Sequence, residues 1–206
     1  QMKVIKFFAL SALILGFASC QSGQKDENAQ DSTAVAEVAV ISVDDLLANP
    51  DSLVGQTITI EGVCSHLCKH GGRKAFLVGA GENATPFRCE ATEEMGGSFP
   101  QETIKKNLRV TGVLVEDRID EEYVKSMEEQ NAAAEKVAKK EGNDANKEES
   151  CETETKAQGQ DAAASFANRM ADYRARIAER QAKEGKPYLS FYHLDAKKYE
   201  IVNDEK

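Results

Sequence analysis

The sequence of 206 residues has no tryptophan, only three histidines and a shortage of positive charge. Lysine and arginine together number 26, against 35 aspartates and glutamates, so the formal net charge at pH 7 is −9. Binding to nucleic acid depends on basic side chains that neutralise phosphates. Because this chain is strongly acidic, it has no long-range attraction to nucleic acid, and we expect no nucleic-acid partner.

Motifs typical of enzymes and redox proteins are also missing. The sequence contains no glycine-rich phosphate loop, no serine–histidine–acid order and no paired-carboxylate site. It lacks a Cys-x-x-Cys pair at the start of a helix, which thiol oxidoreductases use. It also lacks the Cys-x-x-Cys-His motif of covalent haem attachment. We therefore expect a protein that is not an enzyme.

Long hydrophobic runs are absent as well. The apolar run at residues 7–17 has eleven residues, whereas a membrane-spanning helix needs about 20. A short basic segment at residues 2–6 precedes this run, and the small residues Ala18 and Ser19 follow it. A basic start, a short apolar centre and small residues at the end are typical of a secretory signal peptide. We predict that residues 1–19 form this signal peptide.

The residue after the predicted signal peptide is a cysteine. The segment Phe17-Ala-Ser-Cys20 resembles a bacterial lipobox, in which the cysteine is lipidated and becomes the mature N-terminus. This resemblance implies a membrane anchor at Cys20 made of several acyl chains such as palmitate, since one chain alone holds only marginally. Removal of residues 1–19 also removes Lys3 and Lys6, so the net charge changes from −9 to −11. A secreted protein without a lipid is the alternative.

Residues 20–40 are polar and rich in small side chains, which indicates a flexible tether between the lipid and a folded body. Within it, Gln24-Lys-Asp-Glu27 resembles the acidic export signal of some Bacteroidetes lipoproteins that reach the cell surface. This resemblance implies an outer-membrane lipoprotein that faces the periplasm or the cell surface. In such a compartment, the four remaining cysteines can form disulfides.

The hydrophobic pattern after the tether alternates with the period of β-strands. Strands are predicted at residues 56–63, 74–78, 85–91, 107–116 and 188–194, with an extension at 199–202. A short helix is expected at 43–50 and a helical turn at 102–106. Longer helices are predicted at 121–140 and at about 162–183, and the residues between them form a polar linker. The second long helix has an apolar seam of Phe166, Met170, Tyr173 and Ile177, and the first has one of Tyr123, Met127, Ala134 and Val137.

Five strands in this order resemble the OB-fold, a small Greek-key barrel. The segments 53–63 and 108–116, which share an alternating strand pattern around a glycine, are similar to strands one and four of bacterial extracytoplasmic OB domains. We therefore predict a mainly β protein with an OB-fold-like barrel of five strands. Residues 41–117 form strands one to four and residues 187–206 form the last strand and tail. A helical hairpin with its polar linker occupies residues 118–186 between strands four and five.

Three roles are possible for the predicted helical hairpin. Its two helices can brace one opening of the barrel, cover a site or dock a partner, or pair with a second copy of the chain. The docking role implies an envelope protein as the partner.

A cluster of metal-binding residue types lies at the predicted turn between the first two strands. Cys64, His66, Cys68 and His70 alternate with other residues, and zinc and copper favour these donors. An extended stretch of this length spans about 20 Å, so it cannot bring all four donors to one ion. We therefore expect the chain to curl directly after Cys64, or only a subset to bind.

Two further residues can complete such a site, and disulfides are the competing explanation. Cys89 and His193, on the predicted third and fifth strands, are additional candidate ligands. Alternatively, Cys64 pairs with Cys68 if their Cα atoms come within about 7 Å, or Cys89 pairs with either of them. Cys151, in the polar linker, can tether the hairpin by a disulfide or remain free.

The same turn contains the main basic cluster of this acidic chain. Exposed backbone amides beside two glycines, together with three cations, favour binding of an anion or another small ligand. The residues of this predicted loop are Lys69, Gly71, Gly72, Arg73 and Lys74. Solubilising turn residues are the alternative interpretation.

These observations predict a lipid-anchored, non-enzymatic OB-fold module. Its ligand is a metal ion such as zinc, or a small molecule, bound at the hairpin that contains Cys64 and Cys68. The alternative is a disulfide-stabilised protein-interaction module of the outer membrane that uses its helical hairpin.

Overall fold

The computed structural model describes residues 39–69, 71–81, 84–141 and 151–202. The predicted signal peptide, Cys20 and nearly all of the predicted tether lie outside these ranges, as does His70. Within the described ranges, no helix is both long enough and apolar enough to cross a membrane.

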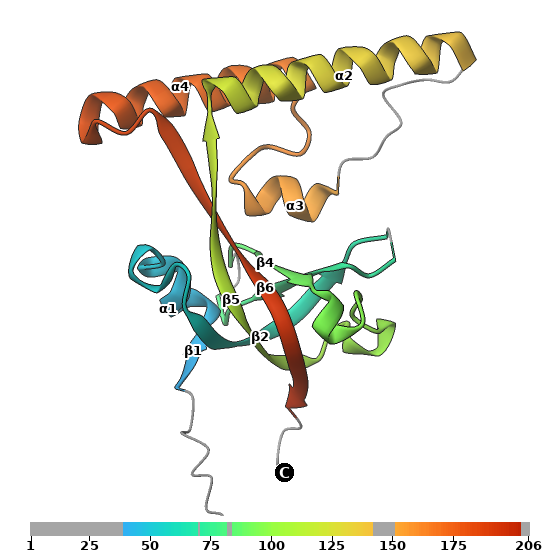
Figure 1. Cartoon of the computed structure of the whole chain (residues 1–206), viewed down its shortest axis with the longest axis vertical. Coiled ribbons are helices and arrows are strands. Elements are labelled where there is room, and N and C mark those ends of the chain that lie inside the picture. The colour runs from blue at the N-terminus through green and yellow to red at the C-terminus, as the bar shows by residue number, and fades with distance from the viewer. Residues whose placement is uncertain (1–38, 70, 82–83, 142–150, 203–206) are drawn as a thin grey trace, which may run out of the picture. The chain divides into compact units, whose positions relative to one another are not determined.

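The strands form a closed barrel with one added strand (Figure 1). They are β1 (Val40–Ser42), β2 (Thr57–Leu67), β3 (Lys74–Val78), β4 (Phe87–Ala91), β5 (Asn107–Asp120) and β6 (Tyr188–Val202). Their order is β1-β2-β3-β4-β6-β5, and β2 also pairs with β5, which closes the five-stranded barrel. The β4–β6 pair is parallel, whereas the other pairs within the barrel are antiparallel. This arrangement confirms a closed barrel of five strands and is consistent with an OB-fold-like barrel.

The helices lie before the barrel and between its last two strands. They are α1 (Val43–Ala48), α2 (Glu121–Glu141), α3 (Glu152–Ala157) and α4 (Phe166–Glu184), with short 3-10 turns at Asp51–Leu53, Glu93–Met95 and Gln101–Thr103. We call the chain between β5 and β6, which contains α2, α3 and α4, the insertion. Figure 1 shows α2 and α4 side by side, beyond the end of the barrel from which β5 and β6 extend.

The barrel interior is apolar because every second residue of its strands points inward. Phe87, Cys89 and Ala91 of β4 are all buried, as their spacing predicts. Ile60 of β2 and Leu114 of β5 are fully buried and belong to the same core cluster. Thr59 of β2 is also buried, and its hydroxyl lies 2.8 Å from that of Thr111 on β5.

Strands β5 and β6 are longer than the sequence predicts. They pair from Asn107↔Val202 to Asp120↔Tyr188, so both continue past the barrel as a two-stranded ribbon. The apolar alternation of β5 ends near Glu116, but Arg118 extends the ribbon by lying over the Tyr188 ring at 4.5 Å. This ribbon leads directly into the insertion.

A second apolar core forms where the ribbon meets the insertion. The predicted α4 seam is confirmed, because Met170, Tyr173 and Ile177 are buried in this cluster. The predicted α2 seam is confirmed only at Met127, which is partly buried against this cluster. Val124 is the buried residue of α2, whereas Tyr123 and Val137 are 51% and 54% exposed. The predicted seam fails at Tyr123 because the neighbouring Val124 faces the core instead, and at Val137 because the second core includes residues only from the start of α2.

Candidate functional site

Of the three cysteines predicted as metal ligands, Cys64 and Cys89 lie in the barrel core, whereas Cys68 is half-buried directly after β2. Cys64 and Cys89 are fully buried, and burial raises the pKa of both thiols. Metal binding requires a thiolate, so this apolar environment opposes ligation by either residue. Among the described residues, Cys64, Cys89 and Cys151 are free thiols.

The expected curl after Cys64 is wrong, because β2 continues to Leu67. A bulge between Cys64 and His66 shifts the register there. The extended strand keeps Cys64 and Cys68 too far apart for a disulfide. Cys64 is also separated from Cys89 by the whole of β3, because its partner is Leu77 of that strand. Two strand spacings amount to about 10 Å, which exceeds the Cα distance that a disulfide tolerates.

The predicted histidine ligands lie apart from the buried cysteines. His66 is half-buried, and its ring centroid is 5.9 Å from that of Phe76. His193 pairs with Arg88, the residue next to Cys89 on β4, and adjacent residues of a strand point to opposite faces. Cys89 and His193 therefore lie on opposite sides of the barrel wall.

Among the described residues, no three side chains of the His, Cys, Asp and Glu types are arranged so that they could hold one metal ion. The four-donor site, of which His70 lies outside the described ranges, stays a prediction.

The predicted anion loop is only partly available for a ligand. Gly71 and Gly72 have φ angles of +78° and +67°. Their amides donate to the carbonyls of Lys69 and Cys68, at 3.0 and 3.2 Å. These amides are therefore not free for an anion. The side chain of Lys74 binds a carboxylate elsewhere, whereas Lys69 and Arg73 are exposed.

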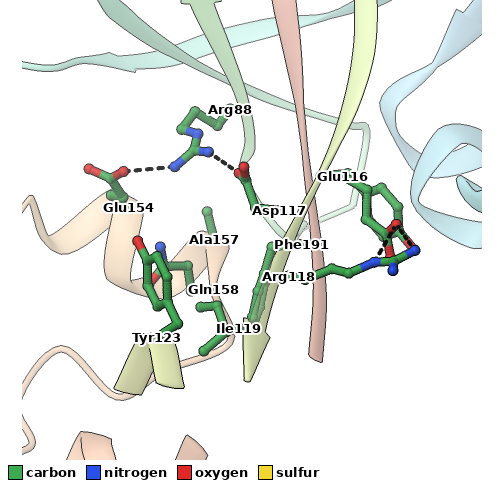
Figure 2. Close-up of a pocket in the computed structure, with 11 residues that line it drawn as sticks. Arg88, Glu116, Asp117, Arg118, Ile119, Tyr123, Glu154, Ala157, Gln158 and Phe191 are labelled. Carbon is green, nitrogen blue, oxygen red and sulfur yellow. Dashed lines mark hydrogen bonds and ion pairs between the residues drawn. The ribbon is translucent and has the colours of Figure 1, made fainter. Parts of the chain in front are cut away.

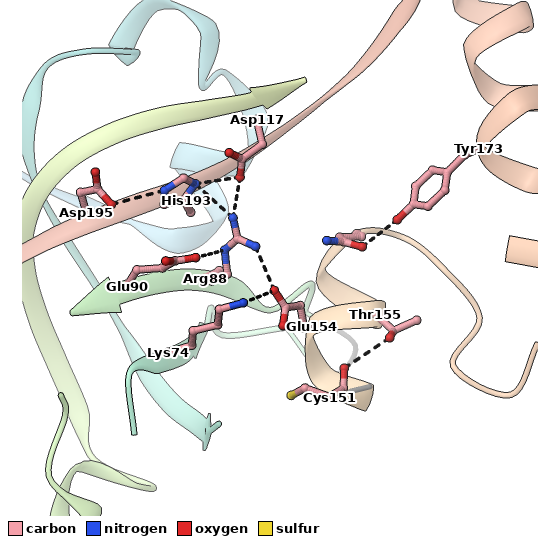
Figure 3. Close-up of polar contacts among 11 residues, drawn as sticks. Lys74, Arg88, Glu90, Asp117, Cys151, Glu154, Thr155, Tyr173, His193 and Asp195 are labelled. Carbon is pink, nitrogen blue, oxygen red and sulfur yellow. Dashed lines mark hydrogen bonds and ion pairs between the residues drawn. The ribbon is translucent and has the colours of Figure 1, made fainter. Parts of the chain in front are cut away.

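A larger set of charged side chains meets on the outer barrel wall, centred on Arg88 of β4. We call this set the Arg88 cluster, and Figure 3 shows how its members converge. Its residues are Lys74, Arg88, Glu90, Asp117, Glu154, His193 and Asp195. They come from β3, β4, β5, β6 and the short helix α3.

Arg88 connects the insertion to the barrel. Its Nη1 donates to Glu154 Oε1 at 3.0 Å and its Nη2 donates to Asp117 Oδ2 at 2.5 Å. Its Nε lies 3.1 Å from Glu90 Oε1 but forms no well-aligned hydrogen bond. Lys74 Nζ donates to the same Glu154 oxygen at 2.6 Å. One carboxylate of α3 therefore binds two barrel cations at once.

Helix α3 is also fixed at its far end, and it has no counterpart in the sequence prediction. Tyr173 of α4 donates to Gln158 Oε1 at 2.7 Å, and Gln160 donates to Asp172. The buried Thr155 donates to the carbonyl of Cys151. Part of the predicted polar linker is thus a short helix held between the barrel and α4.

The electrostatics of the cluster favour ionised carboxylates. Burial alone would raise the pKa of Glu154, but hydrogen bonds and charge from Lys74 and Arg88 lower it overall. The pKa of Asp117 is lowered in the same way, with His193 and Arg88 outweighing burial. Both carboxylates stabilise the fold while they are charged.

This arrangement predicts acid sensitivity. A carboxyl with a lowered folded-state pKa contributes stability above its ordinary pKa and loses it as the pH falls. We expect the unfolding free energy of the full chain to decrease as the pH falls below 4.5, the ordinary value for Glu154. Glu154→Gln should show a shallower decrease, because it has one fewer carboxylate to protonate. Denaturant unfolding at several pH values measures both, with the exposed Glu102→Gln as control. Equal slopes in Glu154→Gln and wild type would contradict this account.

A cleft lies beside the Arg88 cluster, between the barrel wall and the insertion (Figure 2). We call it the insertion cleft, and its volume is about 280 Å³. Its lining residues are Arg88, Glu116, Asp117, Arg118, Ile119, Tyr123, Glu154, Ala157, Gln158, Phe191 and Tyr192. Arg88, Asp117 and Glu154 form one charged end, and Glu116 and Arg118 lie apart from them (Figure 2). The apolar and aromatic side chains come from the ribbon, α3 and the start of α2.

Comparison with known proteins adds little to this site. No family model matches the sequence, and no curated protein matches it. Among solved structures, one similar chain is described as a "putative aspartyl-tRNA synthetase" from Leishmania major Friedlin. The two sequences are 19% identical with a TM-score of 0.27, and the match covers 43% of this chain and 18% of that one. A likeness at this level supports no functional inference.

Proposed function

We propose that this protein is a non-enzymatic, lipid-anchored module that binds a small ligand in the insertion cleft. The observation that carries the proposal is the position of α3. By binding Lys74 and Arg88 through Glu154, α3 turns part of the outer barrel wall into a cleft. Ligand sites are typically concave and mostly apolar, with a few converging polar groups. The insertion cleft is concave on the scale of a small molecule or a single side chain, and its charged groups converge beside aromatic side chains, although its lining is more polar than apolar.

The anchor and the location rest on the sequence alone. The apolar run at residues 7–17 and the lipobox resemblance at Cys20 support lipid attachment there. The segment Gln24-Lys-Asp-Glu27 supports an outer-membrane lipoprotein that faces the periplasm or the cell surface.

A binding role is favoured over catalysis by the surroundings of His193. Its Nδ1 is 2.8 Å from Asp117 Oδ2 and its Nε2 is 3.3 Å from Asp195 Oδ1. General acid–base catalysis needs a ring nitrogen within reach of a substrate proton. Here both nitrogens face carboxylates of the cluster, so His193 is placed to orient Asp117.

We also propose that α2 and α4 form the helical hairpin inserted between strands four and five of an OB-fold, here β5 and β6. Their shared core around Val124 and Met170 supports this pairing. The hairpin makes one wall of the cleft through Tyr123. The capture of an envelope protein by the hairpin, and zinc binding at Cys64, His66, Cys68 and His70, stay predictions for pull-down and metal analysis.

The absence of tryptophan provides a direct test of the cleft. In a Tyr123→Trp variant of the full chain, all tryptophan emission comes from the cleft wall. The probes are benzamidine, benzamide and benzoate, which share a planar shape but carry a positive, no or a negative charge. We expect at least one probe to change the emission in a saturable way. The control is Val137→Trp, at an exposed position of the same helix.

Two results would decide against this function. The first is that none of the three probes changes the tryptophan emission of Tyr123→Trp. The other is an equal change in Val137→Trp, which would indicate non-specific quenching or binding along α2.

A further inference from the structure

We infer that the insertion cleft binds a cationic group, an ammonium, amidinium or guanidinium, carried on a small apolar body. This inference rests on the proposed function and specifies the class of its ligand. Three features of the cleft support it: its cationic side chains are already paired, two of its carboxylates each keep an unpaired oxygen, and aromatic side chains lie nearby.

The cations of the cleft are already occupied by carboxylates. Arg88 contacts Glu90, Asp117 and Glu154 through its three guanidinium nitrogens. Arg118 donates to Glu116 Oε2 from both Nε and Nη2, at 3.0 and 2.9 Å. Figure 2 shows the Arg118 side chain directed away from Arg88, toward Glu116. An anionic ligand would have to break these pairs, so the cleft does not favour one.

The carboxylates, in contrast, each keep an oxygen available. Every polar contact that the described residues make with Glu154 uses Oε1, which receives both Lys74 and Arg88. Every such contact with Asp117 uses Oδ2, which receives Arg88 and contacts His193. The side chains of Glu154 and Asp117 are 23% and 41% exposed. Their second oxygens, Oε2 and Oδ1, receive no hydrogen bond from the described residues, and we assign them as the acceptors for a ligand.

The charge of the surroundings favours a cation as well. Within the Arg88 cluster the two cations, Lys74 and Arg88, face four carboxylates, so the formal charge is −2 when His193 is left out. Adding one positive group brings this charge closer to neutrality. The net charge of the whole chain, −9, also attracts cations toward the site.

Aromatic side chains complete the site. Tyr123, Phe191 and Tyr192 line the cleft beside the charged end. Aromatic faces attract cations and also cover the apolar part of a ligand. Arg176 already lies 5.8 Å from the centroid of the Phe191 ring, which leaves Tyr123, at 51% exposure, as the main surface for a ligand. Ile119 adds an apolar wall next to it.

The matched probes test this ligand class. In the Tyr123→Trp reporter, we expect benzamidine to bind about tenfold more tightly than benzamide, because hydrogen bonds from charged donors are stronger and tryptophan retains the cation–π surface. Benzoate should show no saturable change. Glu154→Gln in this background should remove most of the preference for benzamidine over benzamide. Glu152→Gln, on the same helix but outside the cleft, should retain it.

The outcomes separate this inference from the proposed function. Benzamide binding as tightly as benzamidine, or benzoate binding best, would overturn the ligand class and leave the cleft as a binding site. No saturable response to any probe would overturn both. Because Glu154→Gln can release α3, circular dichroism is used to check that this variant keeps its helices. A salt titration of the Tyr123→Trp reporter, with Glu154 in place, provides a second test. Affinity for benzamidine that stays constant between 50 and 500 mM salt would also contradict an electrostatic preference.

The cationic group can come from a free small molecule or from a side chain of a peptide. Agmatine and a capped Ala-Arg-Ala peptide, both tested with the same reporter, distinguish these sources. The cleft volume of about 280 Å³ favours the free molecule, so we expect agmatine to bind at least as tightly as the peptide. Tighter binding of the peptide would assign the site to a peptide-borne guanidinium.

Discussion

Among the glycines that the structure describes, Gly112 is the one at which an added methyl group should destabilise the protein most. Gly112 lies in β5, where it pairs with Ala196 of β6 beside a shift in register. An added Cβ would lie 2.2 Å from the carbonyl oxygen of Asp195 and 2.9 Å from the Cα of Ala196. Both obstacles are backbone atoms, which cannot rotate away. Overpacking typically costs about 1–3 kcal/mol, and we expect Gly112→Ala to lose about 3 kcal/mol or more of unfolding free energy.

Gly81→Ala is the matched control for this experiment. The nearest atoms to an added Cβ at Gly81 belong to Ala84 and lie 3.9 Å away. We expect this variant to change the unfolding free energy by less than about 0.5 kcal/mol. Denaturant unfolding of both variants and the wild type measures the difference. Comparable stability of the two variants would mean that β5 and β6 do not approach as closely as described.

Arg88→Met should have the second largest effect. Methionine keeps much of the apolar stem but removes the charge that Glu90, Asp117 and Glu154 share. Arg88 is largely buried, with its side chain 15% exposed. Removing one partner of a buried ion pair costs about 3–5 kcal/mol. Because Asp117 is partly exposed and solvent screens it, we expect a smaller loss of about 2–3 kcal/mol.

Arg109→Met provides the comparison for Arg88→Met. Arg109 also binds a carboxylate, Glu61, across neighbouring strands, but its side chain is 45% exposed. An exposed ion pair contributes less than about 1 kcal/mol, so this variant should lose little. Arg88→Lys should fall between wild type and Arg88→Met, because an ammonium cannot contact three carboxylates in the geometry of a guanidinium. Equal losses in Arg88→Met and Arg109→Met would show that the cluster adds no more stability than a surface pair.

Periodic elements of this fold could be predicted from sequence, because their signal is local. The predicted bounds of β3 match the structure, and the alternation of Phe87, Cys89 and Ala91 placed one face of β4 correctly. The α4 seam was also recognised, since Met170, Tyr173 and Ile177 recur at helical spacing. In each case, apolar residues alone define the buried face.

Elements fixed by distant partners could not be predicted in this way. Helix α3 has six residues and little apolar periodicity, and its position depends on Glu154 meeting Arg88, which is 66 positions away. Arg88 likewise meets His193 across 105 positions. No local pattern indicates such pairs. The insertion cleft was therefore missed entirely.

The candidate metal ligands failed to assemble for a different reason. Cys64, His66 and Cys68 were predicted to meet through a curl of the chain, but β2 stays extended to Leu67 and contains a bulge. The bulge changes which residues face inward, so Cys64 enters the core while His66 contacts the ring of Phe76. A one-residue irregularity of this kind is not visible in the alternation itself.

The position of β6 has a consequence for how the chain folds. Strand β6 is the neighbour of both β4 and β5 in the barrel, yet the whole insertion separates it from β5 along the chain. Until β6 is in place, β4 and β5 each have an unpaired edge, and such edges promote association between chains. Contacts between distant segments also form slowly, because a long loop must first close. Helices α2 and α4, by packing together early, can shorten the effective distance between Asp120 and Tyr188. The insertion would then reduce the entropic cost of bringing β6 to β4 and β5 during folding.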